Sequence, residues 1–292
     1  MQAFDYITVR SISELCSLLS GQNGQIKLLS GGTDLLVQLR EGRVKARLVI
    51  DVKYISEMAE IAYDPKQGLY LGATVSCHRV CQDPHIQAHY PGLVDAVALI
   101  GGIQIQNRAS VGGNVCNASP AADAIPALIV HEAVCQVVGS KGQRQVPIES
   151  FCTAPGKTVL EAGEFLLSIQ LPPPRQNFGA HYLRFIPRNE MDIAVVGAGA
   201  GVTLDNARER FVSACLALGA VAPIPLYVGE AGAFLAGKRV SGEAIAEAAL
   251  IAQAAAQPID DLRGSIEQRK YLSAVLALRA LEKAVQRARG ET

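Results

Sequence analysis

The sequence contains no tryptophan, and aromatic residues make up only 5% of its 292 positions. Proteins that bind single-stranded nucleic acid stack bases on aromatic side chains, so this scarcity argues against such a platform. Charge of one sign is also missing, since Lys plus Arg and Asp plus Glu number 27 each. A neutral chain lacks the electrostatic signature of a protein that binds nucleic acid or an anionic membrane.

Targeting and membrane-spanning segments are not predicted either. Residues 1–5 carry no basic stretch and no apolar core, so we expect no signal peptide and a cytoplasmic protein. The uncharged run at 211–229 has the length of a membrane span, but Gly219, Pro223 and Pro225 interrupt it. We expect a buried strand followed by a loop there.

Closely paired cysteines are absent. The seven cysteines stand at positions 16, 77, 81, 116, 135, 152 and 215, and no two form a C-x-x-C pair. This spacing gives no indication of a zinc or iron–sulfur site. Cys77 and Cys81 are four residues apart and could share one helical face. We expect free, buried or half-buried thiols, in keeping with a reducing cytoplasm.

What is present is an apolar chain, 49% hydrophobic, with a length that suggests about two domains. Residues 4–55 are predicted to form a small βαβ-type unit. A capping box, Ser11 to Glu14, opens a helix over about 12–20; strands are expected at 26–29 and 47–52, with a short helix at 35–40. Beyond it we expect strands at 68–73, 134–138, 144–147 and 165–171, and helices at 78–81 and 92–100.

Three consecutive prolines at 172–174 predict a domain boundary, because proline runs favour an extended connector. The predicted domains are 1–176 and 177–292. In the second, strands at 180–186, 194–204 and 211–218 precede helices over 241–256 and from 265 to about 289. Strands followed by helices indicate an α+β domain.

Two glycine pairs, Gly31-Gly32 and Gly112-Gly113, are the most informative feature of the chain. Adjacent glycines let the backbone adopt positive φ and let a ligand approach without a Cβ in the way. Turns of this kind direct successive N–H groups at a phosphate. We interpret the two pairs as a grip on a diphosphate, with ordinary turns as the alternative.

A third cluster, Gly197, Gly199 and Gly201, is similar to the dinucleotide fingerprint of a Rossmann fold. That fingerprint requires the spacing G-x-G-x-x-G and a following helix. Here the spacing is G-x-G-x-G, and residues 202–206 are typical of a strand that ends in a turn. We therefore predict a close-packed, glycine-rich strand.

The wider segments 28–36 and 109–114 resemble the paired FAD pyrophosphate motifs of the molybdenum hydroxylase flavoprotein subunits. Segments 118–123, 163–169, 188–194 and 218–223 match the same family, so the resemblance covers nearly the whole chain. It implies an α+β protein with a vanillyl-alcohol-oxidase (PCMH-type) FAD-binding domain of two α/β subdomains, about 1–55 and 56–176. A C-terminal α+β domain, with a three-stranded sheet and helices, would follow.

The resemblance also implies a set of FAD-binding residues. The set comprises Lys27, Leu28, Leu29, Ser30, Gly31, Gly32, Thr33, Asp34, Ile100, Ala109, Ser110, Gly112, Gly113, Asn114, Asp123, Phe165, Leu166 and Arg184. Backbone N–H groups of 30–34 and 110–113 would hold the phosphates, with hydroxyls of Thr33 and Ser110 adding hydrogen bonds. No side chain is expected to act as a catalytic acid, base or nucleophile, and none of the five histidines lies in a recognisable metal-ligand pattern.

Four of these residues carry more specific expectations from the family. Asp123 resembles the acid near the ribose or adenine end of FAD, its alternative being a cap or turn residue. Arg184 stands where relatives often have a lysine close to the flavin, or it is a residue of the strand surface. Phe165 or Leu166 would contact the adenine or flavin side, and Ile100 stands where some relatives place an aromatic beside the isoalloxazine ring.

The function that the resemblance implies is electron transfer through non-covalently bound FAD. Molybdopterin would belong to a large partner subunit and [2Fe–2S] centres to a small one, in a dimer of heterotrimers. Electrons would leave to NAD⁺ or another acceptor. A self-sufficient FAD-dependent reductase or oxidase and a flavin-less docking scaffold are the alternatives.

Overall fold

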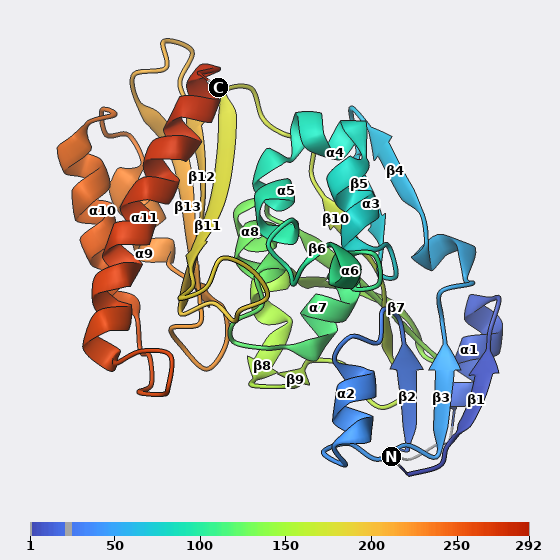
Figure 1. Ribbon diagram of the computed structural model, residues 1–292. Helices are drawn as coiled ribbons and strands as arrows, with labels where there is room; N and C mark the ends of the chain where they lie inside the picture. The colour runs from blue at the N-terminus through green and yellow to red at the C-terminus, as the bar shows by residue number, and fades with distance from the viewer. Residues whose placement is uncertain (1, 21–24, 292) are drawn as a thin grey trace.

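The amino-terminal part of the chain forms a small parallel sheet, at the blue end of Figure 1. The computed structural model describes residues 2–20 and 25–291. The strands follow the order β1-β3-β2, with bounds Asp5–Thr8 (β1), Ile26–Leu29 (β2) and Leu48–Asp51 (β3). Helices α1 (Ile12–Leu19) and α2 (Leu35–Arg40) connect them, so the predicted βαβ-type unit is confirmed.

A second, five-stranded sheet has the order β4-β5-β10-β6-β7 and is antiparallel throughout. Its strands are β4 (Ile61–Asp64), β5 (Gly68–Gly72), β6 (Val134–Gly139), β7 (Gly142–Pro147) and β10 (Phe165–Leu171). A helical region inserts between β5 and β6: α3 (Cys77–Gln82), α4 (Pro84–His89), α5 (Pro91–Val97), α6 (Ile103–Gln106), α7 (Val111–Asn117) and α8 (Ala124–Val130). Two 3₁₀ turns, Ser56–Met58 and Ile148–Ser150, and the short hairpin β8 (Cys152–Ala154) and β9 (Lys157–Thr158) complete this region.

The carboxyl-terminal part has its own sheet and its own core. Strands β11 (Phe178–Phe185), β12 (Val196–Leu204) and β13 (Phe211–Gly219) are the three predicted ones, and β14 (Leu226–Tyr227) adds a two-residue strand beside β13. Helices α9 (Gly229–Leu235), α10 (Gly242–Ala255) and α11 (Ile266–Arg289) cover one face (Figure 1). The three prolines join β10 to β11, which belong to different sheets.

Helix starts follow local signals in the sequence. The hydroxyls of Ser11, Ser241 and Ser265 each accept a hydrogen bond from the backbone N–H three residues later. These bonds satisfy an otherwise unpaired donor at the first turn. Because such caps act within four residues, the predicted starts of α1, α10 and α11 agree with the structure.

The glycine-rich strand β12 packs closely against helix α8. This helix lies between the second sheet and the carboxyl-terminal sheet (Figure 1). A Cβ on Gly199 would lie 2.9 Å from the carbonyl oxygen of Pro126, and one on Gly201 2.9 Å from that of Val130. The alternate residues Ala198 and Ala200 face the helices of the carboxyl-terminal core. The prediction of a close-packed strand is confirmed, and no helix follows the glycines.

Several short elements were not predicted, among them β4, α4 and the helices α6 to α8. Helix α8 contains Pro126, a residue type that usually argues against a helix. It stands at the third position of the helix, where its missing N–H has no partner to lose. The second glycine pair likewise argued against a helix at α7, because glycine is a poor helix former.

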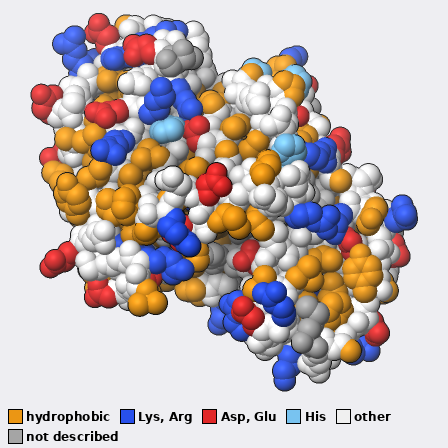
Figure 2. All heavy atoms as spheres, in the orientation of Figure 1, with side chains coloured by type: hydrophobic (Ala, Val, Ile, Leu, Met, Phe, Trp, Pro, Cys, Tyr) orange, Lys and Arg blue, Asp and Glu red, His pale blue; other side chains and the backbone are white. Residues whose placement is uncertain are grey.

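The uncharged run at 211–229 forms strand β13 followed by a loop, as predicted. Within residues 2–20 and 25–291, no helix is both long and apolar enough to cross a membrane. Positive and negative side chains are interspersed on the face that Figure 2 shows, in keeping with their equal numbers. All seven cysteines are free thiols, and burial raises the pKa of Cys77 to about 12.

His131 lies buried at the junction of the two parts, between the rings of Tyr90 and Phe178. Its Nε2 atom has no hydrogen-bond partner among the described residues. Burial lowers the pKa of His131 to about 4; nearby Asp95 opposes this shift and Arg287 adds to it. The folded protein therefore holds this ring neutral at a pH where the unfolded chain protonates it.

This arrangement predicts that stability falls as the pH drops from about 6.5 to about 4, where the unfolded chain binds the extra proton. The loss is expected to reach at most about 3 kcal/mol. A His131→Phe variant should lose this contribution and so show a shallower decline. Urea unfolding of both proteins across this range measures the difference, and parallel curves would rule out His131 as the cause.

Candidate functional site

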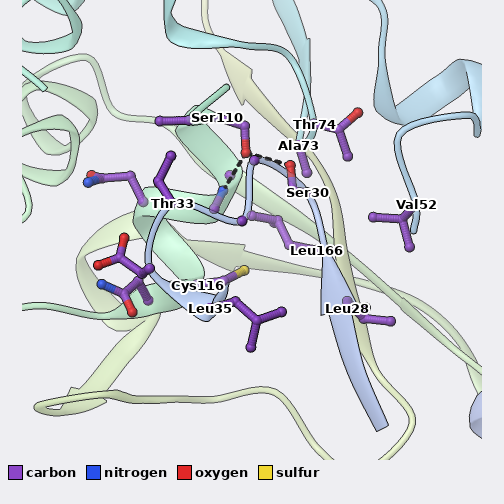
Figure 3. Close-up of a pocket in the computed structure, with 18 of the residues that line it drawn as sticks. Leu28, Ser30, Thr33, Leu35, Val52, Ala73, Thr74, Ser110, Cys116 and Leu166 are labelled. Atoms are coloured by element: carbon purple, nitrogen blue, oxygen red, sulfur yellow. Dashed lines mark hydrogen bonds between the residues drawn. The ribbon is translucent and has the colours of Figure 1, made fainter. Parts of the chain in front are cut away.

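A cavity of about 410 Å³ lies where the first sheet and helix α7 meet the end of β5 and the start of β10 in the second sheet (Figure 3). The predicted site residues that line it are Lys27, Leu28, Ser30, Gly31, Gly32, Thr33, Asp34, Ile100, Ala109, Ser110, Gly112, Gly113, Asn114, Phe165 and Leu166. Segments eighty residues apart in sequence thus form one concave surface. Their contact with a ligand stays a prediction.

The first glycine pair follows β2 and leads into α2. Gly32 has φ +78°, a left-handed conformation that favours glycine. Gly31 serves a different purpose, because a Cβ there would lie 2.2 Å from the carbonyl oxygen of Arg108. The first segment therefore reverses direction at Gly32 and touches the second segment at Gly31.

The second glycine pair is not a turn, contrary to our interpretation; it forms the first turn of helix α7. Neither Gly112 nor Gly113 has positive φ. A Cβ on Gly112 would lie 2.4 Å from the carbonyl oxygen of Ala73, so this glycine permits helix α7 to sit directly on the chain that leaves β5. The physical reason for Gly112 is close packing of backbones rather than a strained turn.

Two serine hydroxyls join the segments. Ser30 Oγ and Ser110 Oγ are 2.7 Å apart, and Ser110 Oγ also accepts from the N–H of Gly113 at 3.0 Å (Figure 3). Ser110 is thus the cap of α7 and the link to the first segment at once. The pair fixes the spacing of the two backbones along the cavity wall.

The charges in the cavity indicate how an anion could be held. Lys27, Asp34 and Glu164 are the charged residues of the described lining, and Glu164 is already paired with Arg144. A diphosphate would therefore depend on backbone N–H groups and hydroxyls more than on cations. Beside them, Leu28, Val52 and Leu166 offer apolar surface for a planar ring (Figure 3).

Three predicted residues are absent from the described lining. Leu29 packs in a small core with Leu39 and Val49. Asp123 Oδ2 accepts from Arg184 Nη1 at 2.6 Å, so these two residues bind each other. Their predicted contact with FAD is not visible in the cavity lining and stays a prediction.

The pair is buried, with the Arg184 side chain 4% exposed and that of Asp123 8%. Tyr182 donates its hydroxyl to Asp123 Oδ1 at 2.7 Å. Burial raises the pKa of Asp123 to about 6, against the lowering effect of the Arg184 charge and the two hydrogen bonds. Asp123 stands at the cap position of α8, but its side chain makes no capping bond among the described residues.

Ten lining residues were not predicted: Leu35, Gln38, Val52, Met58, Ala73, Thr74, Cys116, Asn117, Leu160 and Glu164. Leu35 and Gln38 belong to α2, and Cys116 and Asn117 to α7, each one helical turn from a predicted residue. Helical periodicity could have found these four. Val52, Met58 and Thr74 arrive through tertiary contacts that carry no local signal.

A second cavity, also about 410 Å³, lies between the two parts of the chain. Its described lining includes Glu132 and Glu149, and Arg175 at the rim forms an ion pair with Glu132 at 2.6 Å. It has no adjacent glycines, and its two carboxylates disfavour an anion. A dinucleotide therefore fits the first cavity better.

Comparison with known proteins assigns both halves of the chain. The family model described as FAD binding domain in molybdopterin dehydrogenase matches residues 2–174, and that of the CO dehydrogenase flavoprotein C-terminal domain matches residues 181–284. A xanthine dehydrogenase FAD-binding subunit of Escherichia coli is 33% identical over 226 residues, 76% of this chain and 77% of the relative.

Two further comparisons cover nearly the whole chain. The carbon monoxide dehydrogenase medium chain of Hydrogenophaga pseudoflava is 30% identical over 281 residues, 96% of each chain. A solved structure of carbon monoxide dehydrogenase from the same organism, lacking the Mo-pyranopterin moiety of the molybdenum cofactor, superposes with a TM-score of 0.93 at 29% identity. That match covers 98% of both chains.

Proposed function

Since the chain belongs to the FAD-binding flavoprotein subunits of the molybdenum hydroxylases, which are oxidoreductases, we propose that it is the electron-exit subunit of such a complex. FAD bound here would take up electrons from [2Fe–2S] centres of a small partner subunit and pass them to NAD⁺ or another acceptor. Molybdopterin would lie in a large partner subunit, in a dimer of heterotrimers. The FAD-binding domain would span 1–176 and the carboxyl-terminal domain 177–292.

In this proposal the residues bind and orient the cofactor without reacting. Backbone N–H groups near Gly32 and Gly113 hold the diphosphate, and the Ser30–Ser110 hydrogen bond sets their spacing. The apolar surface beside them accepts a ring. Asp123 and Arg184 would act from the buried pair described above.

The observation that carries the proposal is Gly113. A Cβ there would meet only Ser110 Oγ, at 2.9 Å, and no described backbone atom outside its own helix. Glycine inside a helix costs about 1 kcal/mol relative to alanine, and nothing in the packing requires it. A ligand that approaches the bare backbone supplies the missing reason.

Replacing Gly113 with alanine is therefore expected to weaken FAD binding about tenfold or more, because the methyl group occupies the path of the phosphate. Stability of the apoprotein should change little, since alanine favours the helix but crowds the Ser110 hydroxyl that caps it. Calorimetric titration with FAD and urea unfolding measure the two effects.

Gly242→Ala is the matched control, since Gly242 opens helix α10 with no described atom within 4 Å of its Cβ position. It should leave FAD binding unchanged.

Equal FAD affinity of the Gly113 variant and the unchanged protein would show that the start of helix α7 does not contact FAD. A wild-type chain that takes up no FAD would support the alternative of a flavin-less docking scaffold. A chain that reduces an acceptor without partner subunits would support a self-sufficient reductase.

A further inference from the structure

One wall of the cavity is formed by a short irregular segment, residues 159–164, between β9 and β10, and by the first residues of β10. Leu160 and Glu164 of this segment line the cavity, together with Phe165 and Leu166 at the start of β10. Irregular backbone has few hydrogen bonds of its own, so its position depends on side chains that hold it. Two of its backbone N–H groups are bonded elsewhere, that of Val159 to the carbonyl oxygen of Phe151 and that of Leu160 to Thr158 Oγ1. Three further hydrogen bonds to the segment come from one side chain, that of Arg144 on strand β7.

Arg144 holds the segment at two places. Its Nε donates to Glu164 Oε1 at 2.8 Å and its Nη2 to Glu164 Oε2 at 2.6 Å, a two-point ion pair. The same Nη2 donates to the carbonyl oxygen of Val159 at 2.9 Å. Glu164 Oε2 also accepts from the N–H of Glu161 at 2.8 Å, which closes the turn.

The electrostatics of the pair agree with this geometry. Hydrogen bonds from Arg144 lower the pKa of Glu164 against the opposing effect of burial, so the carboxylate is charged near neutral pH. Glu164 is 16% exposed, and its stem passes over Gly139, where a Cβ would be 3.0 Å from its Cγ. Arg144 itself is not among the described lining residues, so it can act on a ligand only through this wall.

We propose that Arg144 is a positioning residue that fixes this wall for the nucleotide half of FAD. The inference rests on the proposed function. In this arrangement the diphosphate lies at the glycine segments and the isoalloxazine ring on the Ile100 side. The apolar part of the cavity, lined by Leu28, Val52 and Leu166, is then left for the adenosine group. The segment held by Arg144 leads directly into β10, whose second residue is Leu166.

The test compares three probes, FAD, ADP and FMN, on the full chain with Arg144→Ala. We expect affinity for FAD and ADP to fall about tenfold, since removing a two-point ion pair frees the wall. FMN, which lacks the adenosine half, should bind as in the unchanged protein. Arg144→Lys keeps the charge but not the planar fork and should recover only part of the loss.

Arg175→Ala is the matched control, since Arg175 also pairs with a glutamate at 2.6 Å but lies in the second cavity. It should leave all three affinities unchanged. An equal loss for FMN and FAD in the Arg144 variant, or no loss for either, would overturn the positioning role. If Arg144→Ala does not fold, the Arg144→Lys variant decides by the same comparison. Failure of the unchanged chain to bind FAD would instead contradict the proposed function.

Discussion

Replacing Gly112 with alanine is expected to destabilise the apoprotein by about 2 kcal/mol or more and to abolish retention of FAD. A Cβ at this position would lie 2.4 Å from the carbonyl oxygen and 2.6 Å from the Cα of Ala73. Both are backbone atoms, which cannot rotate aside. Helix α7 would have to move away from β5, and it would take Ser110 and Gly113 with it.

Urea unfolding of the apoprotein and visible absorbance of the purified protein check the two parts of this prediction. The Gly112 variant should lose stability and flavin together, whereas the adjacent Gly113→Ala should lose affinity alone. Gly242→Ala again serves as the control for an unhindered helical glycine. An undiminished unfolding free energy in the Gly112 variant would show that α7 is not packed as closely as the structure indicates.

The contrast between these adjacent glycines shows which features of the site could be predicted from the sequence. A glycine pair indicates that side chains are excluded, but not by what. In the structure Gly32 is required by its own φ, Gly31 and Gly112 by contact with another backbone, and Gly113 by neither. Only the first of these reasons is local, so the interpretation of both pairs as turns was wrong for the second.

Elements set by local chemistry were predicted well for the same reason. The serine caps of α1, α10 and α11 act within four residues, and the alternation of glycine and alanine in β12 is a property of the strand itself. Helix α8 was missed because it is stabilised by burial of its whole surface rather than by a cap. Val52, Met58 and Thr74 also line the cavity. They could not be predicted, because the contacts that place them there arise only on folding.

Asp123 and Arg184 form an ion pair that is buried between the two parts of the chain. Asp123→Asn is expected to destabilise the protein by about 3–5 kcal/mol, because it leaves the guanidinium of Arg184 buried without a counter-charge. Arg184 has little freedom to reach water, since its side chain is 4% exposed and its Nε already lacks a partner among the described residues. Denaturant unfolding near neutral pH measures the loss.

A second substitution shows whether the loss of stability comes from the unpaired charge of Arg184 or from altered packing. Asp123→Asn combined with Arg184→Met removes both charges and should regain most of the stability, since no unpaired charge is left buried. Arg175→Ala breaks an exposed pair instead, with both side chains more than half exposed, and should cost less than about 1 kcal/mol. A double variant as unstable as Asp123→Asn would contradict the assignment of the penalty to the unpaired charge. The flavin potential of the double variant is then compared with that of Asp123→Asn, from which it differs only at position 184: Arg184 acts on the ring only if the potential falls between the two.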